Sequence, residues 1–396
     1  MSERTDGNYR SSQHFMSTSP WDAHKVMAVT AAKCNARLGD TDGQCLSIDE
    51  SSVGKSGKQS VGVSRQYNGN LGKVDNCQTG VYASLSKDNK VGLVNARLYL
   101  PKEWTDDPSR CKKAGIPMDE QGYKTKPELA LEMIRELVSN GVGFGWVNAD
   151  GLYGQSHAFR NGVADMGLHY VVDVHSDQQV FLSEPKVCLP EAPKGKGRKA
   201  TKYKAEGEKT PVSDYLEALP DEELVHTRIR KGTKGWITSH VHTVKVWTWD
   251  GKEGRAREHT LIIRKGKGDD LKYALSNFTE GEQDTQRLAL MQAQRFWIEH
   301  AFKEAKGELG MADYQFRKHR AWYHHQALVM MAMDFINQEK ETFAEELPLL
   351  SLRDVRIQIA TIFSDDRARL DREIKTMHKR HKKRQYDINR YYPDDQ

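Results

Sequence analysis

The chain has 396 residues, of which 37% are hydrophobic and 29% are charged, and its formal net charge at pH 7 is +5. This length is enough for one large domain or two ordinary ones, and the composition is typical of a soluble globular protein with much polar surface. A net charge this small gives the whole molecule only a modest electrostatic field.

The sequence lacks the patterns of a secreted or membrane protein. The N-terminal stretch MSERTDGNYR has no apolar core and is not a signal peptide. The longest apolar run, near 327–333, is too short to span a bilayer. The five cysteines are odd in number and form no Cys-x-x-Cys pair, which argues against a zinc site or a disulfide framework. We therefore expect a cytoplasmic protein with reduced thiols and no membrane partner.

Positive charge is concentrated in two runs. Residues 194–209 carry seven Lys and Arg, and residues 375–384 carry six with two His. Such runs are often solvated tails, but their commonest functional use is to bind a polyanion.

The first 175 residues predict a short helical segment, 1–44, followed by an α/β arrangement of strands and helices. Ser19-Pro20 is a helix start signal in the first segment. Apolar and alternating stretches predict four strands, at 45–49, 61–68, 76–86 and 91–100. After an excursion at 101–123, helices are predicted from Lys126-Pro127 and over 156–167, and strands over 144–150 and 168–175.

Residues 176–270 break this pattern and predict an inserted β-rich subdomain with a basic loop. Two alternating stretches within it, 236–250 and 257–265, are typical of a hairpin. The chain then returns to the core at 271–340, with one long helix predicted over 286–310, and ends in a helical basic tail at 341–396.

Two aspartates each follow an apolar strand. If the strands that precede Asp49 and Asp150 lie adjacent and parallel, both carboxylates meet at the same edge of the sheet. A helix packed across that edge would add Glu299. Like charges raise one another's pKa, so three converging carboxylates need cations. Mg²⁺, a hard ion that prefers oxygen ligands, fits this need, and a pair of such ions is suited to phosphodiester chemistry.

The helix at 286–310 has one face that suits the same chemistry. At about 100° per residue, four polar residues fall within an arc of roughly 60°; they are Gln292, Arg295, Glu299 and Lys306. The two cations on this face could grip phosphates next to Glu299.

Each candidate also has a plain structural interpretation. Asp49 and Asp150 could each only start a turn, and Glu299 could only pair with Arg295. Glu50 is a rival ligand, but alternation along its strand places it on the opposite side from Asp49. GKSGKQSVG at 54–62 lacks the spacing of a Walker A loop, so its lysines, Lys55 and Lys58, are expected to touch a DNA backbone or solvent.

Taken together, these stretches resemble bacterial insertion-sequence transposases of the DDE superfamily, over about 19–351. The resemblance rests on five segments, namely 48–78, 97–117, TKPELALEMI, NADGLYG at 148–154, and 288–332. One group in that superfamily has a Tyr, two residues, Arg, three residues, Glu, six residues, Lys pattern. Arg295, Glu299 and Lys306 fit its spacing, whereas Gln292 stands where that group has Tyr.

The resemblance implies an RNase H-like mixed sheet flanked by helices, with 45–175 and 271–340 as the two parts of this core. It implies Asp49, Asp150 and Glu299 as catalytic, metal-binding acids that hold two Mg²⁺ ions, or Mn²⁺ in their place. It implies cleavage at transposon ends and strand transfer into target DNA. The partners would be double-stranded DNA and a second copy of the chain, and Arg295, Lys306, Lys55 and Lys58 would contact DNA.

Two departures leave an alternative open. Only 48 residues precede Asp49, fewer than this group usually has for binding transposon ends, and Gln292 replaces the tyrosine. Both favour a shortened or repurposed transposase-derived protein that binds DNA without cutting. The presence of Asp49, Asp150 and Glu299 favours the enzyme. A stand-alone RNase H-like nuclease is a third possibility, against which the insertion and the Arg-Glu-Lys face argue.

Overall fold

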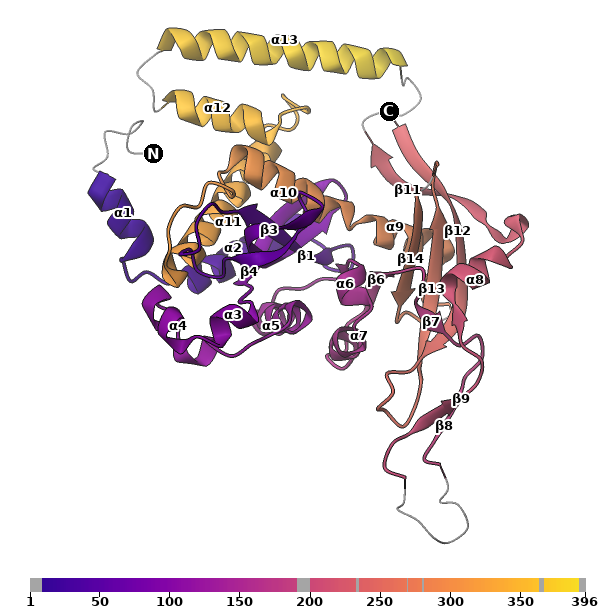
Figure 1. The fold of residues 1–396 in the computed structure, drawn as a ribbon. Coiled ribbons are helices and arrows are strands. Elements are labelled where there is room, and N and C mark those ends of the chain that lie inside the picture. The colour runs from indigo at the N-terminus through magenta and orange to yellow at the C-terminus, as the bar shows by residue number, and fades with distance from the viewer. Residues whose placement is uncertain are drawn as a thin grey trace.

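The computed structural model describes residues 9–190, 200–232, 235–268, 270–279, 281–362 and 367–391. Residues 194–199 of the first basic run therefore lie outside the described residues. A ten-stranded sheet crosses the molecule, and helices cover both of its faces (Figure 1). None of the described helices combines the length and the apolar character needed to cross a membrane.

The centre of the sheet has the mixed arrangement of an RNase H-like core. β1 (Cys45–Gly54) pairs antiparallel with β3 (Lys73–Lys87) and parallel with β5 (Trp146–Ala149). β5 in turn pairs parallel with β6 (Tyr170–Val174), and β3 pairs antiparallel with β4 (Lys90–Leu98) on its far side. The order is therefore β4-β3-β1-β5-β6, with β2 (Ser64–Asn68) on the outer part of β3. The expected parallel pairing of the strands that precede Asp49 and Asp150 is confirmed.

Alternation along β1 separates two layers of core. Leu46 and Ile48 pack toward α5 (Lys126–Ser139) and α7 (His157–Ala164). Cys45, with the opposite orientation, packs with α9 (Thr285–Ala293). Because side chains alternate across a strand, Asp49 shares the α9 side with Cys45, and Glu50 shares the α5 side with Ile48.

The two strands predicted as a hairpin in the insertion belong to this same sheet, between two further strands that the sequence analysis did not identify. β11 (Val225–Gly232), β12 (Gly235–Thr248), β13 (Arg257–Lys265) and β14 (Leu271–Ser276) pair antiparallel in sequence, and β14 pairs antiparallel with β6. The predicted hairpin is β12 and β13. The division of the chain into domains stays a prediction.

The remaining elements are short or peripheral. In the N-terminal half they are α1 (Tyr9–Ser17), α2 (Ala23–Leu38), α3 (Lys102–Thr105), α4 (Pro108–Ala114), a 3₁₀ turn (Met118–Glu120) and α6 (Gly151–Gly154). In the insertion they are β7 (Gln179–Val180), β8 (Lys186–Cys188), β9 (Lys204–Glu206), β10 (Thr210–Pro211), α8 (Val212–Glu217) and a 3₁₀ turn (Asp221–Glu223).

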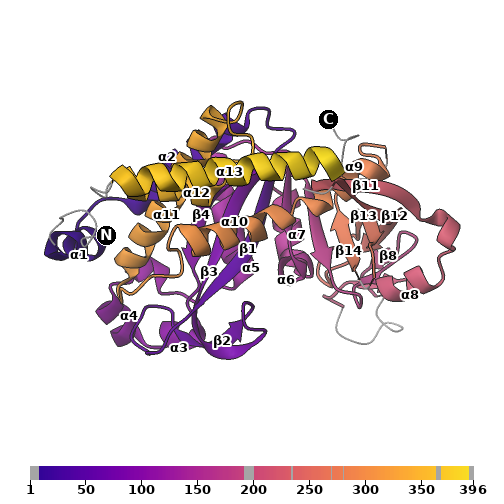
Figure 2. The ribbon, with the colours of Figure 1, turned by 90° about the horizontal axis from the view of Figure 1, so that it is seen from above.

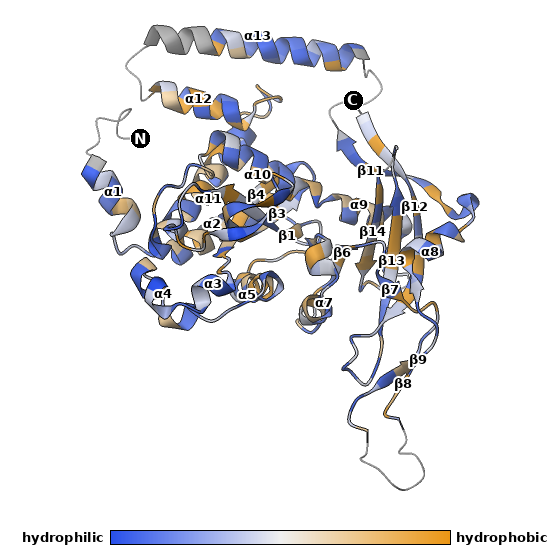
Figure 3. Ribbon diagram, in the orientation of Figure 1, coloured by the Kyte–Doolittle hydropathy of each residue, from blue (hydrophilic) through white to orange (hydrophobic). Residues whose placement is uncertain are grey.

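The C-terminal third is helical. It comprises α9, α10 (Phe296–Glu308), α11 (His319–Thr342), α12 (Leu352–Ile362) and α13 (Arg367–Tyr391). α10 and α11 pack on the sheet face that carries Tyr82. Seen from above, α13 crosses the molecule on the side of α10 (Figure 2). It is mostly hydrophilic, whereas the strands of the sheet are largely hydrophobic (Figure 3).

The prediction of a single helix over 286–310 is wrong. The structure divides this stretch into α9 and α10, with a break at Gln294 and Arg295. At the break, the backbone makes hydrogen bonds between residues three apart, as in a 3₁₀ turn. They run from Gln294 N to Met291 O at 3.2 Å and from Arg295 N to Gln292 O at 3.4 Å. The buried side chain of Asn148 on β5 donates to the same two carbonyls, at 2.9 and 3.3 Å. Residues with good helix propensity are bent here by a tertiary contact that their own sequence does not reveal.

Candidate active site

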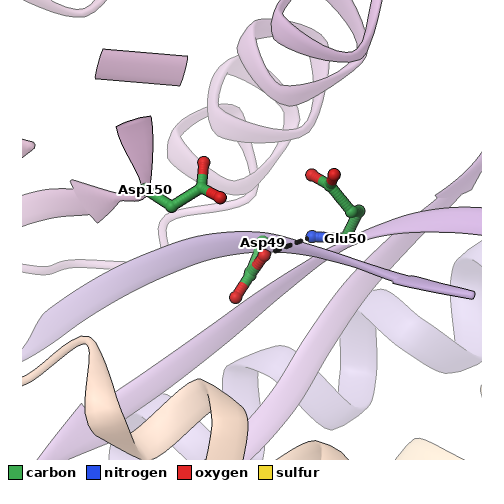
Figure 4. A group of neighbouring side chains, drawn as sticks. All are labelled: Asp49, Glu50 and Asp150. Carbon is green, nitrogen blue, oxygen red and sulfur yellow. Dashed lines mark hydrogen bonds between the residues drawn. The ribbon is translucent and has the colours of Figure 1, made fainter. Parts of the chain in front are cut away.

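Asp49 and Asp150 lie side by side because their strands are parallel neighbours. Ile48 pairs in register with Ala149, so the two aspartates follow at equivalent positions. Asp150 also caps α6, where its Oδ1 accepts a hydrogen bond from Leu152 N at 3.0 Å. Asp49 Oδ1 accepts one from Glu50 N at 2.8 Å (Figure 4). As expected from the sequence, these two carboxylates lie close together, just after the paired residues of β1 and β5.

A third carboxylate, that of Glu50, lies close to Asp49 and Asp150. One oxygen from each of Asp49, Glu50 and Asp150 lies within 4.8 Å of the others. Even so, Asp49 and Glu50 point to opposite sides of β1 (Figure 4), as alternation predicts. Glu50 is already engaged on the α5 side, where Lys126 Nζ lies 2.8 Å from Oε1 and the Tyr153 hydroxyl 3.1 Å from Oε2.

Burial makes the two aspartates costly to ionise without a cation. It raises the pKa of Asp49 to about 8, and the neighbouring charge of Asp150 adds to the rise. Burial, followed by the charge of Glu50, also raises the pKa of Asp150 above its ordinary value. Arg295 acts in the opposite direction on both groups.

Arg295, in the break between α9 and α10, contacts three carboxylates. Its Nη1 lies 3.6 Å from Asp49 Oδ2, its Nη2 lies 2.7 Å from Glu299 Oε1, and its Nε lies 3.1 Å from Asp173 Oδ2. Burial alone would lower the pKa of Arg295, but these carboxylates outweigh it and raise the pKa. The guanidinium therefore supplies positive charge at the point where acids converge.

The structure places Glu299 across Arg295 from Asp49. Its side chain is 51% exposed and is bonded to Arg295, one helical turn earlier. Glu299 is thus linked to Asp49 through a shared guanidinium and is not among the three acids whose oxygens lie closest together. The expected Arg295–Glu299 pair is present, and the role of Glu299 as a third metal-binding acid stays a prediction.

Asp173 on β6 is a site residue that the sequence interpretation missed. Its Oδ1 accepts a hydrogen bond from Gln292 Nε2 at 3.0 Å, while its Oδ2 meets Arg295. The available signal was a single acid inside the apolar strand YVVDV, which an alternating or buried strand does not need. Gln292 therefore reaches an acid of the site through its amide.

The predicted DNA-contacting lysines have different surroundings. Lys306 is linked to Asn70, with Nζ 2.9 Å from Oδ1. Burial lowers the pKa of Lys306, and the charge of Asp49 acts against that effect. Lys55 instead donates to the carbonyl of Tyr314 and lies over its ring, while the side chain of Lys58 is exposed.

A pocket of about 260 Å³ opens beside Arg295 and Glu299. Its opposite wall comes from the strands β11–β14 and carries Arg230, Arg264 and Lys272, together with Asp270 from the turn before β14. Arg230 lies over the ring of Phe296, with Cζ 3.6 Å from the ring centre. The charged side chains that line this pocket are therefore mixed, with a small excess of positive charge.

The donor set fits hard divalent cations. Carboxylate oxygens are the ligands that Mg²⁺ and Mn²⁺ prefer, and buried acids with raised pKa values are stabilised when a cation replaces their protons. Asp49 and Asp150 fit such a role directly. Glu299 and Asp49 contact the same guanidinium, that of Arg295. Glu299 would therefore bind the cation if its carboxylate gave up Arg295 and took the metal ion as its partner.

Two comparisons of sequence show the family to which the chain belongs. A family model described as DDE superfamily endonuclease matches residues 1–236, which include Asp49 and Asp150. The probable transposase for insertion sequence element IS701 of Microchaete diplosiphon is 33% identical over 319 residues, covering 78% of this chain and 69% of that protein. A cryo-EM structure of a piggyBac transposase synaptic complex with hairpin DNA aligns with a TM-score of 0.40 and 13% identity. The alignment covers 90% of this chain, and this chain spans 59% of that one.

Proposed function

Because the chain belongs to the DDE superfamily of endonucleases, we propose that it is a DNA transposase that cuts element ends and joins them to target DNA. The observation that carries this proposal is the position of Arg295, which bridges Asp49 to Glu299 while Asp150 lies against Asp49. Asp49 and Glu299 thus meet the same guanidinium, and Asp150 adds a third acid through its contact with Asp49.

The proposed chemistry has two balanced steps. In the first, water attacks the phosphorus at the element's end, the bond from phosphorus to O3′ breaks, and a 3′ hydroxyl and a 5′ phosphate are formed. In the second, that 3′ hydroxyl loses its proton and attacks a phosphodiester of the target, whose own O3′ leaves. In each step one P–O bond breaks, one P–O bond forms, and a proton passes from the attacking oxygen to the leaving O3′, so no redox partner is needed.

Asp49, Asp150 and Glu299 would hold the two divalent cations, Mg²⁺ or Mn²⁺. Such ions lower the pKa of the attacking group and neutralise charge on the leaving oxygen. Arg295 is positioned to hold a non-bridging phosphate oxygen through its terminal nitrogens, which point toward the acids. Lys306, on the same helix as Glu299, would hold a neighbouring phosphate of the DNA. Lys55 and Lys58 would hold a phosphate further along the DNA strand.

The outer face of α13 is a second surface that we assign to DNA. Its inner face is fixed to α12 by the buried Met377 and by His381, whose Nε2 lies 3.2 Å from Asp354 Oδ2. The exposed cations of α13 include Lys375, Lys379, Lys382, Lys383 and Arg384. Within the described chain these five form no ion pair, and like charges four residues apart destabilise a helix unless an anion is near.

One assay tests the proposal. The protein is incubated with Mg²⁺ and linear DNA that carries the element's own terminal repeats, beside an Asp150→Ala variant. Strand transfer by the wild type that is lost in the variant supports a transposase. Binding without cutting by either protein supports the alternative of a transposase-derived DNA-binding protein. Nicking without joining supports a stand-alone nuclease. Cross-linking on the same DNA reports whether two copies assemble.

A further inference from the structure

Asp173 has both of its carboxylate oxygens engaged by residues at the break between α9 and α10. Oδ1 accepts from Gln292 Nε2 at 3.0 Å, and Oδ2 lies 3.1 Å from Arg295 Nε. The Asp173 side chain is only 14% exposed, in the middle of a buried strand. A charge in such a place is costly unless it is paired and hydrogen-bonded, as it is here.

The way Asp173 holds Arg295 determines where the rest of the guanidinium points. An arginine fork is planar, so a contact at Nε fixes the plane and leaves both terminal nitrogens for other partners. Those nitrogens point to Asp49 and Glu299, at 3.6 and 2.7 Å. Asp173 takes the one nitrogen that does not face these acids.

We propose that Asp173 is a positioning residue that keeps Arg295 directed at the scissile phosphate. This inference rests on the proposed function. Asp49 and Glu299 can each change partner during a reaction, whereas Asp173 lies on the far side of the guanidinium and keeps its contact throughout. Arg295 then stays in place when its terminal nitrogens pass from carboxylate to phosphate oxygens.

Gln292 is the second part of this device. Its side chain is buried, and its Oε1 has no hydrogen-bond partner among the described residues. An unpaired buried acceptor is unfavourable, so the amide is placed there for its donor, which holds Asp173. Gln292 thus fixes the carboxylate that in turn fixes Arg295.

A double-mutant cycle tests the proposal, with Asp173→Asn, Arg295→Gln and the double variant. Single-turnover cleavage is measured at saturating Mg²⁺, and DNA binding is measured as a function of salt. Asp173→Asn is expected to slow cleavage by about 10- to 100-fold. The double variant should be no slower than Arg295→Gln alone, because Asp173 acts through Arg295. In both single variants, the slope of log K for DNA binding against log salt should become smaller by about 0.9, which corresponds to the loss of one phosphate contact.

The matched control is Asp334→Asn. Asp334 and Arg37 form a pair of similar burial, 3.3 Å apart, between α11 and α2. This control should lose stability but keep the cleavage rate and the salt slope of the wild type. The proposal is overturned if Asp173→Asn behaves like Asp334→Asn, or if its effect adds fully to that of Arg295→Gln. A wild type that neither bound nor cut DNA would overturn the proposed function, and this inference with it.

Discussion

The side chain of Asn148 donates a hydrogen bond to the backbone carbonyl of Met291, 2.9 Å away, at the C-terminal end of α9. Asn148 is two residues before Asp150 on the same chain segment, and Met291 precedes the break that carries Arg295. This contact therefore ties the strand that precedes Asp150 to the end of α9, just before the break from which α10 and Glu299 follow. Because Asn148 is fully buried, water cannot replace it.

Asn148→Ala is expected to disturb the site more than the fold. Losing the donor leaves the carbonyls of Met291 and Gln292 with only their backbone hydrogen bonds, at a cost of about 0.5–1.5 kcal/mol in the free energy of unfolding. The angle between α9 and α10 then relaxes toward a continuous helix, and Arg295 and Glu299 move away from Asp49. Cleavage should fall by about 100-fold, since a displacement of this kind has that effect. Urea unfolding and single-turnover cleavage measure the two effects.

Asn337→Ala is the control for that experiment. Asn337 is also buried, and its amide donates to the carbonyl of Val91 at 2.8 Å, away from the acids. It should lose similar stability and keep its cleavage rate. Equal loss of rate in both variants would show that Asn148 contributes only to general stability.

Gly154 is required by close approach of two backbones. A Cβ at this position would lie 1.8 Å from the carbonyl oxygen of Asp173. Gly154→Ala should therefore push α6 away from β6 and lower the free energy of unfolding by roughly 1–3 kcal/mol. Gly122→Ala, where a Cβ would meet nothing within 4 Å, should change it by less than about 0.5 kcal/mol. Equal urea midpoints for the two variants would contradict the close contact.

Much of the geometry of the candidate site could be predicted from local sequence because it follows from local rules. Strands that end in Asp49 and Asp150 meet once they are parallel neighbours, and the Arg295–Glu299 spacing is one helical turn. Alternation alone placed Glu50 on the far side of β1, where Lys126 holds it.

Two features could not be predicted, because both depend on tertiary contacts. The break at Gln294 lies in residues that favour a helix, and it is held by Asn148 from a strand far away in sequence. Asp173 looked like one polar residue in an apolar strand until its partners on α9 and in the break were known. For the same reason, the added strands could be predicted as a hairpin but not as a continuation of the core sheet through β6 and β14.

His259 makes stability depend on pH at the join between the core and the added strands. Its ring nitrogens meet the Tyr170 hydroxyl at 3.0 Å and the Thr248 hydroxyl at 2.8 Å. Burial, followed by the charge of Arg160, holds its pKa well below the ordinary value of 6.5. The unfolded chain gains a proton below about pH 6.5 that the folded chain does not, so stability is lost as the pH falls.

His259→Gln removes that dependence. The stability advantage of the wild type over this variant should shrink by up to about 2 kcal/mol between about pH 7 and pH 5, measured by urea unfolding at each pH. An advantage that stayed constant, or grew toward acid, would mean that His259 is not held neutral by the fold.

The outer face of α13 should account for part of the salt dependence of DNA binding. Replacing Lys375, Lys379 and Lys383 by Gln removes one row of exposed cations, and the slope of log K against log salt should fall by about 2.7, three phosphate contacts. Replacing Lys33, Lys112 and Lys113, which are equally exposed elsewhere, changes the net charge by the same amount. The assignment fails if the two triple variants have the same slope.

The most direct test of the account is the rate of Mg²⁺-dependent cleavage of element-end DNA by four carboxamide variants: Asp49→Asn, Asp150→Asn, Glu299→Gln and Glu50→Gln. Replacing any one of the three acids that we assign to the metal ions should lower the cleavage rate by at least about 100-fold. Glu50, which Lys126 and Tyr153 hold on the other side of β1, should be replaceable with most of the rate retained. An active Glu299→Gln beside an inactive Glu50→Gln would contradict the account.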